Sequence, residues 1–340
     1  MSVTIKDIAR IAGVSPSTVS RVINGNTAIS QETRSRIRAV MEELDYHPDS
    51  RARNLVNGNT DCIGLILDAR DERSFFNTFF DRSVYAIERV AQEEGYTLMI
   101  SNAAGEGDSS PAQKLVLEKK VDGLVIPPSV VRRDLVDMLR ESGFPFVILG
   151  EPDRMEEEVS WVDADNEGGG QMAVRHLLAQ GYERIALLMG SRKNVFVRNR
   201  IRGYRKGLEE AGLEPEEGLI RECGSPEDAE REAEALLNQK RPPDAFLCGD
   251  NVIAWHVLRT LRKRNVRIPE KAGIVTFDNY PFAEYLEPPL TAVDVDTYGI
   301  GEQAAYRLLQ KIRKADGGER HTLISANLLI RRSSQRKGGE

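Results

Sequence analysis

The sequence predicts a small all-α head at the N-terminus, joined to a large two-lobed α/β body. Apolar residues in the first fifty positions recur at helical spacing, whereas from Asp61 onward short apolar runs alternate with amphipathic stretches. Residues 1–60 hold eight Lys or Arg and six acidic residues, a net charge of +2. Because the whole chain carries −6, the body carries −8. A basic head on an acidic body is expected if only the head meets nucleic acid.

The stretch from Thr4 to Gly25 predicts two short helices separated by a tight turn. Thr4 can cap the first helix, with Asp7 as the carboxylate of a capping box. Ser15 and Pro16 provide a cap and a first-turn proline for the second helix. The outward face of that helix is small, polar or cationic: Ser17, Thr18, Ser20 and Arg21. Such a face suits the DNA major groove, although a helical hairpin of this shape is also a common structural unit.

A third helix and a short basic segment complete the head. Ser30 can cap a helix whose apolar residues recur at i, i+3, i+4 and i+7, enough to close a small core. The segment from His47 to Thr60 then contains a possible helix, Asp49 to Asn57. Since isolated helices below roughly 12 residues are marginal in water, we expect this one to fold only when two copies pack on DNA. A flexible linker is the alternative.

The region from Thr4 to Leu55 resembles the DNA-binding domain and hinge helix of the LacI/GalR family of bacterial transcriptional regulators. The matching segments are TIKDIARIAGVS, STVSRVING, ETRSRI and the ARxL core at Ala52 to Leu55. Asp49 departs from the family, which usually carries asparagine there. The resemblance implies base contacts just after Ser15 and insertion of Leu55 into the minor groove of a near-palindromic operator. The residues expected to contact DNA are Thr4, Pro16, Ser17, Thr18, Ser20, Arg21, Asn24, Ser50, Arg53 and Leu55.

The body contains two successive series of strand and helix signals. Its apolar runs do not alternate with polar residues, as expected for parallel strands that helices cover on both faces. The first series places strands at 63–67, 97–101, 123–127 and 145–150, and helices near 76–94, 111–119 and 132–142. The second places strands at 161–162, 185–189, 245–248 and 273–277, and helices at 167–180, 199–210, 228–239 and 253–264. Two doubly wound lobes with a ligand crevice between them are therefore predicted.

The family resemblance extends weakly through the body and implies a periplasmic-binding-protein-like fold. The expected divisions are a helix-turn-helix domain at 1–46, a hinge helix and linker at 47–60, and an effector-binding and dimerisation domain at 61–332. Within that domain, the first lobe is expected at 61–158 and 291–318, and the second at 159–290 and 319–332. The last part, with residues 291–296, a helix near 299–314 and a strand at 322–330, is expected to cross back and forth between the lobes. A polar tail, 333–340, is expected to be disordered.

Five crevice residues follow from local matches to the family: Asn77, Phe80, Arg200, Asp250 and Asp278. Phe80 could stack on a ligand ring or belong to the core. Arg200, expected at the mouth of the second lobe, could span two hydroxyls or form a surface ion pair. Asp250 and Asp278 follow strands and could accept hydrogen bonds from sugar hydroxyls, or only cap a helix, a role that suits Asp250.

Motifs for other classes of protein are missing from the sequence. It has no GxxxxGK[ST], HExxH or GxSxG, and no cofactor or metal site is expected. Three cysteines, Cys62, Cys223 and Cys248, have no metal or redox spacing and are expected to be buried thiols. Gly168 to Gly170 lacks the spacing of a phosphate loop and indicates close helix packing. With no signal-peptide pattern and no run of 18 apolar residues, a bacterial cytoplasmic, nucleoid-associated protein is expected.

These features predict a homodimeric repressor of a carbohydrate-utilisation operon, not an enzyme. Its small-molecule effector is expected to be a sugar, and a weak resemblance of residues 145–152 to regulators of maltose use suggests an oligosaccharide. Alternatively, the same DNA-binding head could be controlled by a body that responds to a nucleobase or to a phosphoprotein co-repressor. A solute-binding or sugar-modifying protein is the remaining alternative, against which the missing signal peptide and the missing catalytic motifs argue.

Overall fold

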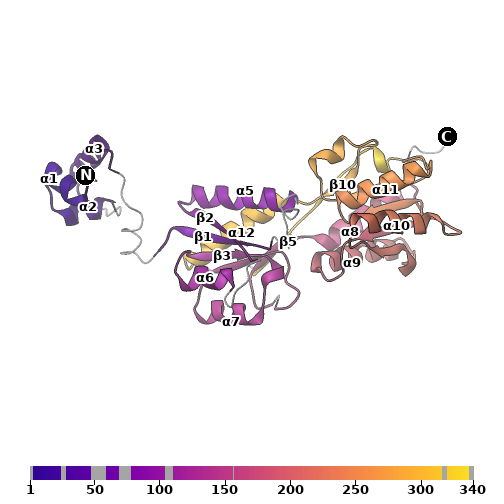
Figure 1. Cartoon of the computed structure of the whole chain (residues 1–340), viewed down its shortest axis with the longest axis horizontal. Coiled ribbons are helices and arrows are strands. Elements are labelled where there is room, and N and C mark those ends of the chain that lie inside the picture. The colour runs from indigo at the N-terminus through magenta and orange to yellow at the C-terminus, as the bar shows by residue number, and fades with distance from the viewer. Residues whose placement is uncertain are drawn as a thin grey trace. The chain divides into compact units, whose positions relative to one another are not determined.

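The structure is a computed structural model that describes residues 3–23, 28–46, 59–68, 78–103, 110–155, 157–315 and 320–336. The chain divides into two compact units, residues 1–61 and 62–340 (Figure 1). The first unit is all helical in its described part, and the second contains two six-stranded sheets. The fold class predicted from the sequence is confirmed.

The head consists of α1 (Ile5–Ala12), α2 (Pro16–Ile23) and α3 (Gln31–Glu43). The predicted capping box is present, since the Thr4 hydroxyl accepts from the Asp7 backbone N–H and the Asp7 carboxylate accepts from the Thr4 N–H at 3.1 Å. Gly13 ends α1 at φ +65°, which residues other than glycine rarely adopt. The three helices share one core: Ile8, Ala9, Ala12, Val19, Val22, Ile37 and Val40.

The first lobe is built on a parallel sheet with the order β11-β5-β4-β3-β1-β2. Helices α5 and α12 pack on one face and α6 and α7 on the other, as Figure 1 shows. The strands are β1 (Cys62–Leu67), β2 (Thr97–Asn102), β3 (Gly123–Ile126), β4 (Phe146–Leu149), β5 (Trp161–Ala164) and β11 (His321–Ile324). The helices are α5 (Thr78–Glu93), α6 (Pro111–Leu117), α7 (Arg133–Glu141) and α12 (Thr297–Ile312), with the short η2 (Pro128–Val130).

The second lobe repeats the plan with the order β12-β10-β9-β8-β6-β7, in which only the β12–β10 pair is antiparallel among the strands described. Helices α8 and α9 cover one face, and α10 and α11 the other. The strands are β6 (Ile185–Met189), β7 (Ile220–Glu222), β8 (Ala245–Cys248), β9 (Gly273–Phe277), β10 (Thr291–Asp294) and β12 (Asn327–Leu329). The helices are α8 (Asn166–Ala179), α9 (Val195–Glu210), α10 (Pro226–Leu237) and α11 (Asn251–Lys263), with η3 (Glu217–Leu219), η4 (Pro281–Glu284) and η5 (Arg332–Ser334).

Three crossovers connect the lobes, and they lie elsewhere than predicted. Strand β5, expected in the second lobe, belongs to the first sheet, whereas β10, expected in the first lobe, belongs to the second. The single strand predicted at 322–330 is two strands, β11 and β12, in different sheets. The sequence also missed β7 and placed the start of α9 four residues late. Short buried runs look alike in a sequence, so their sheet partners could not be assigned from it.

The start of the predicted disordered tail is ordered, so that prediction was wrong for residues 333–336. Ser333 and Ser334 are fully buried. The Ser333 hydroxyl donates to the Ile274 carbonyl at 2.6 Å and accepts from the Thr291 N–H at 2.8 Å. Ser334 shares a hydrogen bond with His176 at 2.7 Å. The hydroxyls can be buried because each has a partner; residues 337–340 lie outside the described residues.

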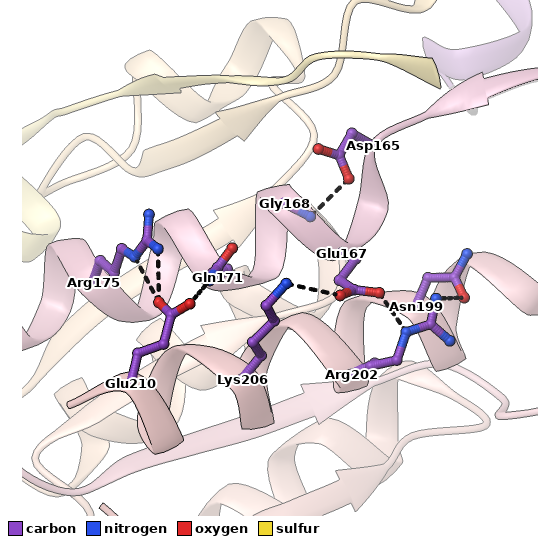
Figure 2. Close-up of polar contacts among 9 residues, drawn as sticks. All are labelled: Asp165, Glu167, Gly168, Gln171, Arg175, Asn199, Arg202, Lys206 and Glu210. Carbon is purple, nitrogen blue, oxygen red and sulfur yellow. Dashed lines mark hydrogen bonds and ion pairs between the residues drawn. The ribbon is translucent and has the colours of Figure 1, made fainter. Parts of the chain in front are cut away.

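Glycines allow α8 and α9 to pack closely; of Gly168 to Gly170, for which close helix packing was predicted, Gly170 is the one that meets α9. A Cβ atom on Gly170 would lie 2.5 Å from the Arg200 carbonyl oxygen, and one on Gly203 would lie 2.0 Å from the Glu167 carbonyl oxygen. Ion pairs and hydrogen bonds line the outer side of the same helix pair (Figure 2). Helices α8 and α9 are therefore packed closely against each other in the second lobe.

Candidate functional site

The outward face of α2 carries the side chains that were predicted to read DNA. Pro16, Ser17 and Arg21 are exposed, while Val19 and Val22 on the opposite side are buried. The Ser15 hydroxyl lies 2.7 Å from that of Ser17. A hydroxyl can donate once and accept twice, so Ser17 keeps the capacity for one contact to a base edge.

Three further residues predicted to contact DNA lie on the described part of the head. Thr18 and Ser20 are partly exposed, and the Thr18 hydroxyl lies 2.9 Å from that of Ser15. The Thr4 hydroxyl donates to the Asp7 carboxylate at 2.7 Å, so α1 already uses it. The remaining four predicted DNA contacts lie outside the described residues: Asn24, Ser50, Arg53 and Leu55.

Arg200 lies in the second lobe beside the residues that follow β8 and β9, and only 5% of it is exposed. Its guanidinium packs 4.0 Å from the ring centroid of Phe277 and 5.1 Å from that of Phe196. Its three nitrogens donate to Asn166 Oδ1 at 2.9 Å, to the Gly249 carbonyl at 2.9 Å and to Asp278 Oδ1 at 3.5 Å. Hydrogen bonds from each guanidinium nitrogen let the cation be buried, and one partner is the predicted ligand acceptor Asp278.

Asp278 follows β9 and has φ +62°, an uncommon backbone conformation for a residue other than glycine. Burial raises the pKa of its carboxyl, an effect that the nearby charge of Arg200 opposes. Asn251, which is fully buried, donates its side-chain amide to the Asp278 carbonyl at 2.7 Å. The strained backbone is thus held by a neighbouring helix.

Asp250 caps α11, the simpler of its two predicted roles. Its carboxylate accepts from the Ile253 N–H at 2.8 Å. Burial raises the pKa of this carboxyl, while the backbone hydrogen bond from Ile253 lowers it. A capping role accounts for its position without a ligand, so Asp278 is the stronger candidate for ligand contact.

A cavity of about 330 Å³ lies where the lobes meet and includes Asp278 in its wall. Burial raises the pKa of the Asp294 carboxyl in the same wall, and the charge of Arg82 opposes that rise. The Arg331 guanidinium is held by Asn279 Oδ1 at 2.9 Å and by the Leu290 carbonyl at 2.8 Å. The lining residues are Asp81, Arg82, Asp278, Asn279, Tyr280, Pro281, Glu284, Asp294, Val295, Thr297 and Arg331.

Two of the predicted crevice residues cannot be placed against this cavity. Asn77 lies outside the described residues, and Phe80 lies in the first turn of α5, with its side chain outside them. The sequence reasoning missed Arg331, which was expected to follow the last strand as the start of a polar tail, and Asp294, which ends β10. Asp294 carried a usable signal, because a carboxylate at the end of a parallel strand faces the crevice.

Several other features of the described residues bear on the class of protein. All three cysteines are buried, as predicted. No three His, Cys, Asp or Glu side chains gather as they would around a metal ion in the described part of the chain. None of its helices is long and apolar enough to cross a membrane.

Known protein families match both the head and the body of the chain. The family model for bacterial regulatory proteins of the lacI family matches residues 4–49, and that for a periplasmic binding protein-like domain matches residues 174–334. A transcriptional repressor PurR from Photobacterium profundum is 31% identical, with 97% of this chain and 98% of the relative covered. The regulator CelR from Thermobifida fusca is 32% identical over 97% and 98% of the two chains.

The chain belongs to the LacI family of bacterial regulatory proteins. It is a DNA-binding transcriptional regulator with a helix-turn-helix head and a periplasmic-binding-protein-like body. Among solved structures, a CelR–cellobiose complex has a TM-score of 0.71 and 31% identity, with 98% of this chain and 100% of that chain covered. A Lac repressor dimer bound to operator and the anti-inducer ONPF has a TM-score of 0.81 and 26% identity, covering 98% and 99%.

Proposed function

We propose that this LacI-family regulator is a homodimeric repressor of a carbohydrate-utilisation operon in the bacterial cytoplasm. The observation that carries the proposal is the polar cavity at the lobe junction, which contains the predicted acceptor Asp278. A sugar that binds there would change the lobe arrangement and hence the operator affinity of the head.

The lining of the cavity favours a sugar. Carboxylates, an amide and two guanidinium groups supply acceptors and donors on several sides, as a ring of hydroxyls requires. The volume of about 330 Å³ is at the small end for ligand sites, which run from roughly 300 Å³ upward. Tyr280 is the one aromatic residue among the described lining residues, and a nucleobase would favour more stacking surface. The CelR relative was solved with cellobiose.

Exposed apolar side chains on the second lobe support a homodimer. They are Val252 and Trp255 on α11, Phe282 in η4 and Tyr285, which follows η4, with exposed fractions of 41%, 37%, 39% and 80%. Aromatic side chains are enriched at protein interfaces relative to the rest of the surface. The Lac repressor relative was solved as a dimer on its operator. Because a twofold dimer presents two recognition helices, we expect a near-palindromic operator that Ser17, Arg21 and Leu55 read.

A thermal unfolding screen with mono- and disaccharides tests the effector class. At 100 times its dissociation constant, an effector should stabilise the folded protein by about 2.7 kcal/mol. Asp278→Asn should lose most of that shift, whereas Asp250→Asn, which keeps a capping oxygen, should retain it. A shift that persists in Asp278→Asn would place the ligand elsewhere, and a nucleobase shift without any sugar shift would contradict the proposal.

A further inference from the structure

Two side-chain contacts cross from the first lobe to the second at the loop after β4. The Asn199 side-chain amide on α9 donates to Glu151 Oε2 at 2.6 Å. Arg198, also on α9, forms an ion pair with Asp153. The Arg198–Asp153 pair is largely exposed, with 40% and 61% of the two side chains accessible. It therefore contributes little to holding the two lobes together. The Asn199–Glu151 bond has an ionised acceptor and a buried donor, and such bonds are roughly twice as strong as neutral ones.

The first-lobe end of the Asn199–Glu151 bond is anchored in the sheet. The Glu151 N–H donates to Asp163 Oδ2 at 3.0 Å, and Asp163 lies in β5, where 6% of it is exposed. The other Asp163 oxygen accepts from the Ala164 N–H at 2.7 Å. Asp163 therefore holds the backbone from which the Glu151 side chain reaches Asn199.

The second-lobe end is anchored as well, as Figure 2 shows on α8 and α9. Arg202 donates to Asn199 Oδ1 at 3.0 Å and forms an ion pair with Glu167 on α8. Lys206 lies 3.5 Å from the same Glu167 carboxylate. The Asn199 amide is therefore oriented with its nitrogen toward Glu151.

We propose that Glu151 and Asn199 form an interlobe latch, which biases the two lobes toward the arrangement seen here independently of any effector. Each end is held by its own lobe, so opening the lobes at this edge must break the bond between them. The latch therefore sets the ratio of the lobe arrangements in the protein without ligand, and a ligand shifts that ratio. The latch does not depend on the identity of the effector.

Exchanging the amide of Asn199 and the carboxylate of Glu151 between the two positions tests the latch. Asn199→Asp places two carboxylates face to face, whereas the Glu151→Gln, Asn199→Asp double variant restores an amide-to-carboxylate bond with the same side-chain lengths. Spin labels at Glu141→Cys on α7 and Glu209→Cys on α9, both exposed, report the distance between the lobes. We expect the ratio of long to short distances to rise about tenfold in Asn199→Asp, as for loss of one charge-assisted hydrogen bond, and to return in the double variant.

Gln171→Ala is the matched control. Gln171 donates to Glu210 at 2.5 Å, also amide to carboxylate, but both residues lie in the second lobe (Figure 2). Its distance distribution should match that of the unmodified protein. If Asn199→Asp does not fold, Glu151→Ala takes its place and should give a similar rise. An unchanged distribution in the single variant, or a double variant as open as Asn199→Asp, would overturn the latch.

Discussion

The side-chain amide of Asn251 donates to the backbone carbonyl of Asp278 at 2.7 Å and to that of Phe277 at 3.0 Å. Asn251 is the first residue of α11 and is fully buried. This bond connects α11 to the end of β9 and holds Asp278 at φ +62°, with its side chain at the cavity. The proposed ligand acceptor is thus positioned by a residue that does not line the cavity.

Asn251→Leu should destabilise the protein because the Asp278 carbonyl would lose this donor and the Phe277 carbonyl would keep only the Thr276 hydroxyl. We expect the free energy of unfolding to fall by about 1–3 kcal/mol, measured by chemical denaturation. Asn194→Leu is the control, since Asn194 is exposed and makes no side-chain cap on α9. Equal effects at both positions would show that the buried amide does not hold the loop.

Stability should depend on pH through Asp163. Burial raises the pKa of this carboxyl from 3.8 to about 6, although backbone hydrogen bonds from Glu151 and Ala164 and the charge of Arg200 oppose the rise. Between these two values the folded chain keeps a proton that the unfolded chain releases, so unfolding becomes easier as pH rises through this window and levels off above about pH 6.

Asp163→Asn isolates that contribution because asparagine does not titrate. The free energy of unfolding of the unmodified protein, minus that of Asp163→Asn, should fall by about 1 kcal/mol between roughly pH 5 and 7. Denaturant titrations at several pH values measure it. A difference that is flat, or that grows with pH, would mean that the carboxyl does not hold its proton in this window.

Gly203→Ala should separate α8 from α9. The added Cβ would meet the Glu167 carbonyl oxygen at 2.0 Å, and backbone cannot move aside as a flexible side chain can. A loss of roughly 1–3 kcal/mol or more is expected in thermal or chemical unfolding. Gly218→Ala meets nothing within 4 Å and should leave stability nearly unchanged. Tolerance of alanine at Gly203 would contradict the close packing described here.

Arg21→Ala should reduce operator discrimination. Arg21 is exposed on α2, and a guanidinium can bind guanine O6 and N7 together. The affinity for a selected operator should fall by about 1–3 kcal/mol, with a much smaller loss on random duplex, both measured by fluorescence anisotropy. Lys6→Ala on α1 removes the same charge from a residue not expected to read bases. Equal losses on both duplexes for Arg21→Ala would exclude base reading.

The head could be predicted closely because its signals are local. The Thr4 and Asp7 capping box, the Gly13 break and the Pro16 start each depend on residues within one helical turn. Most strand positions in the body were predictable for the same reason, since a run of buried apolar residues is a local signal. The short β7, which has one buried residue, was missed. Pairing between strands depends on residues far apart in the chain, which is why β5, β10 and β11 were assigned to the wrong lobe.

Buried polar residues limited the prediction of the site. Ser333 and Arg200 look like surface residues in the sequence, but hydrogen bonds to distant partners allow their burial. Arg331 could not be assigned to the cavity because its place depends on Asn279 and Leu290, about forty to fifty residues earlier. The strand-end position of Asp278, by contrast, was sufficient to predict that it faces a crevice.

If a sugar in the Asp278 cavity controls DNA binding, operator affinity must differ with and without that sugar. Anisotropy titrations of a selected operator, with each sugar that stabilises the protein, should show an affinity change of about tenfold, equivalent to roughly 1.4 kcal/mol of coupling. The change should disappear in Asp278→Asn while affinity without sugar stays within about twofold. An operator affinity that no sugar alters, or a response that survives in Asp278→Asn, would show that a sugar in this cavity does not control DNA binding.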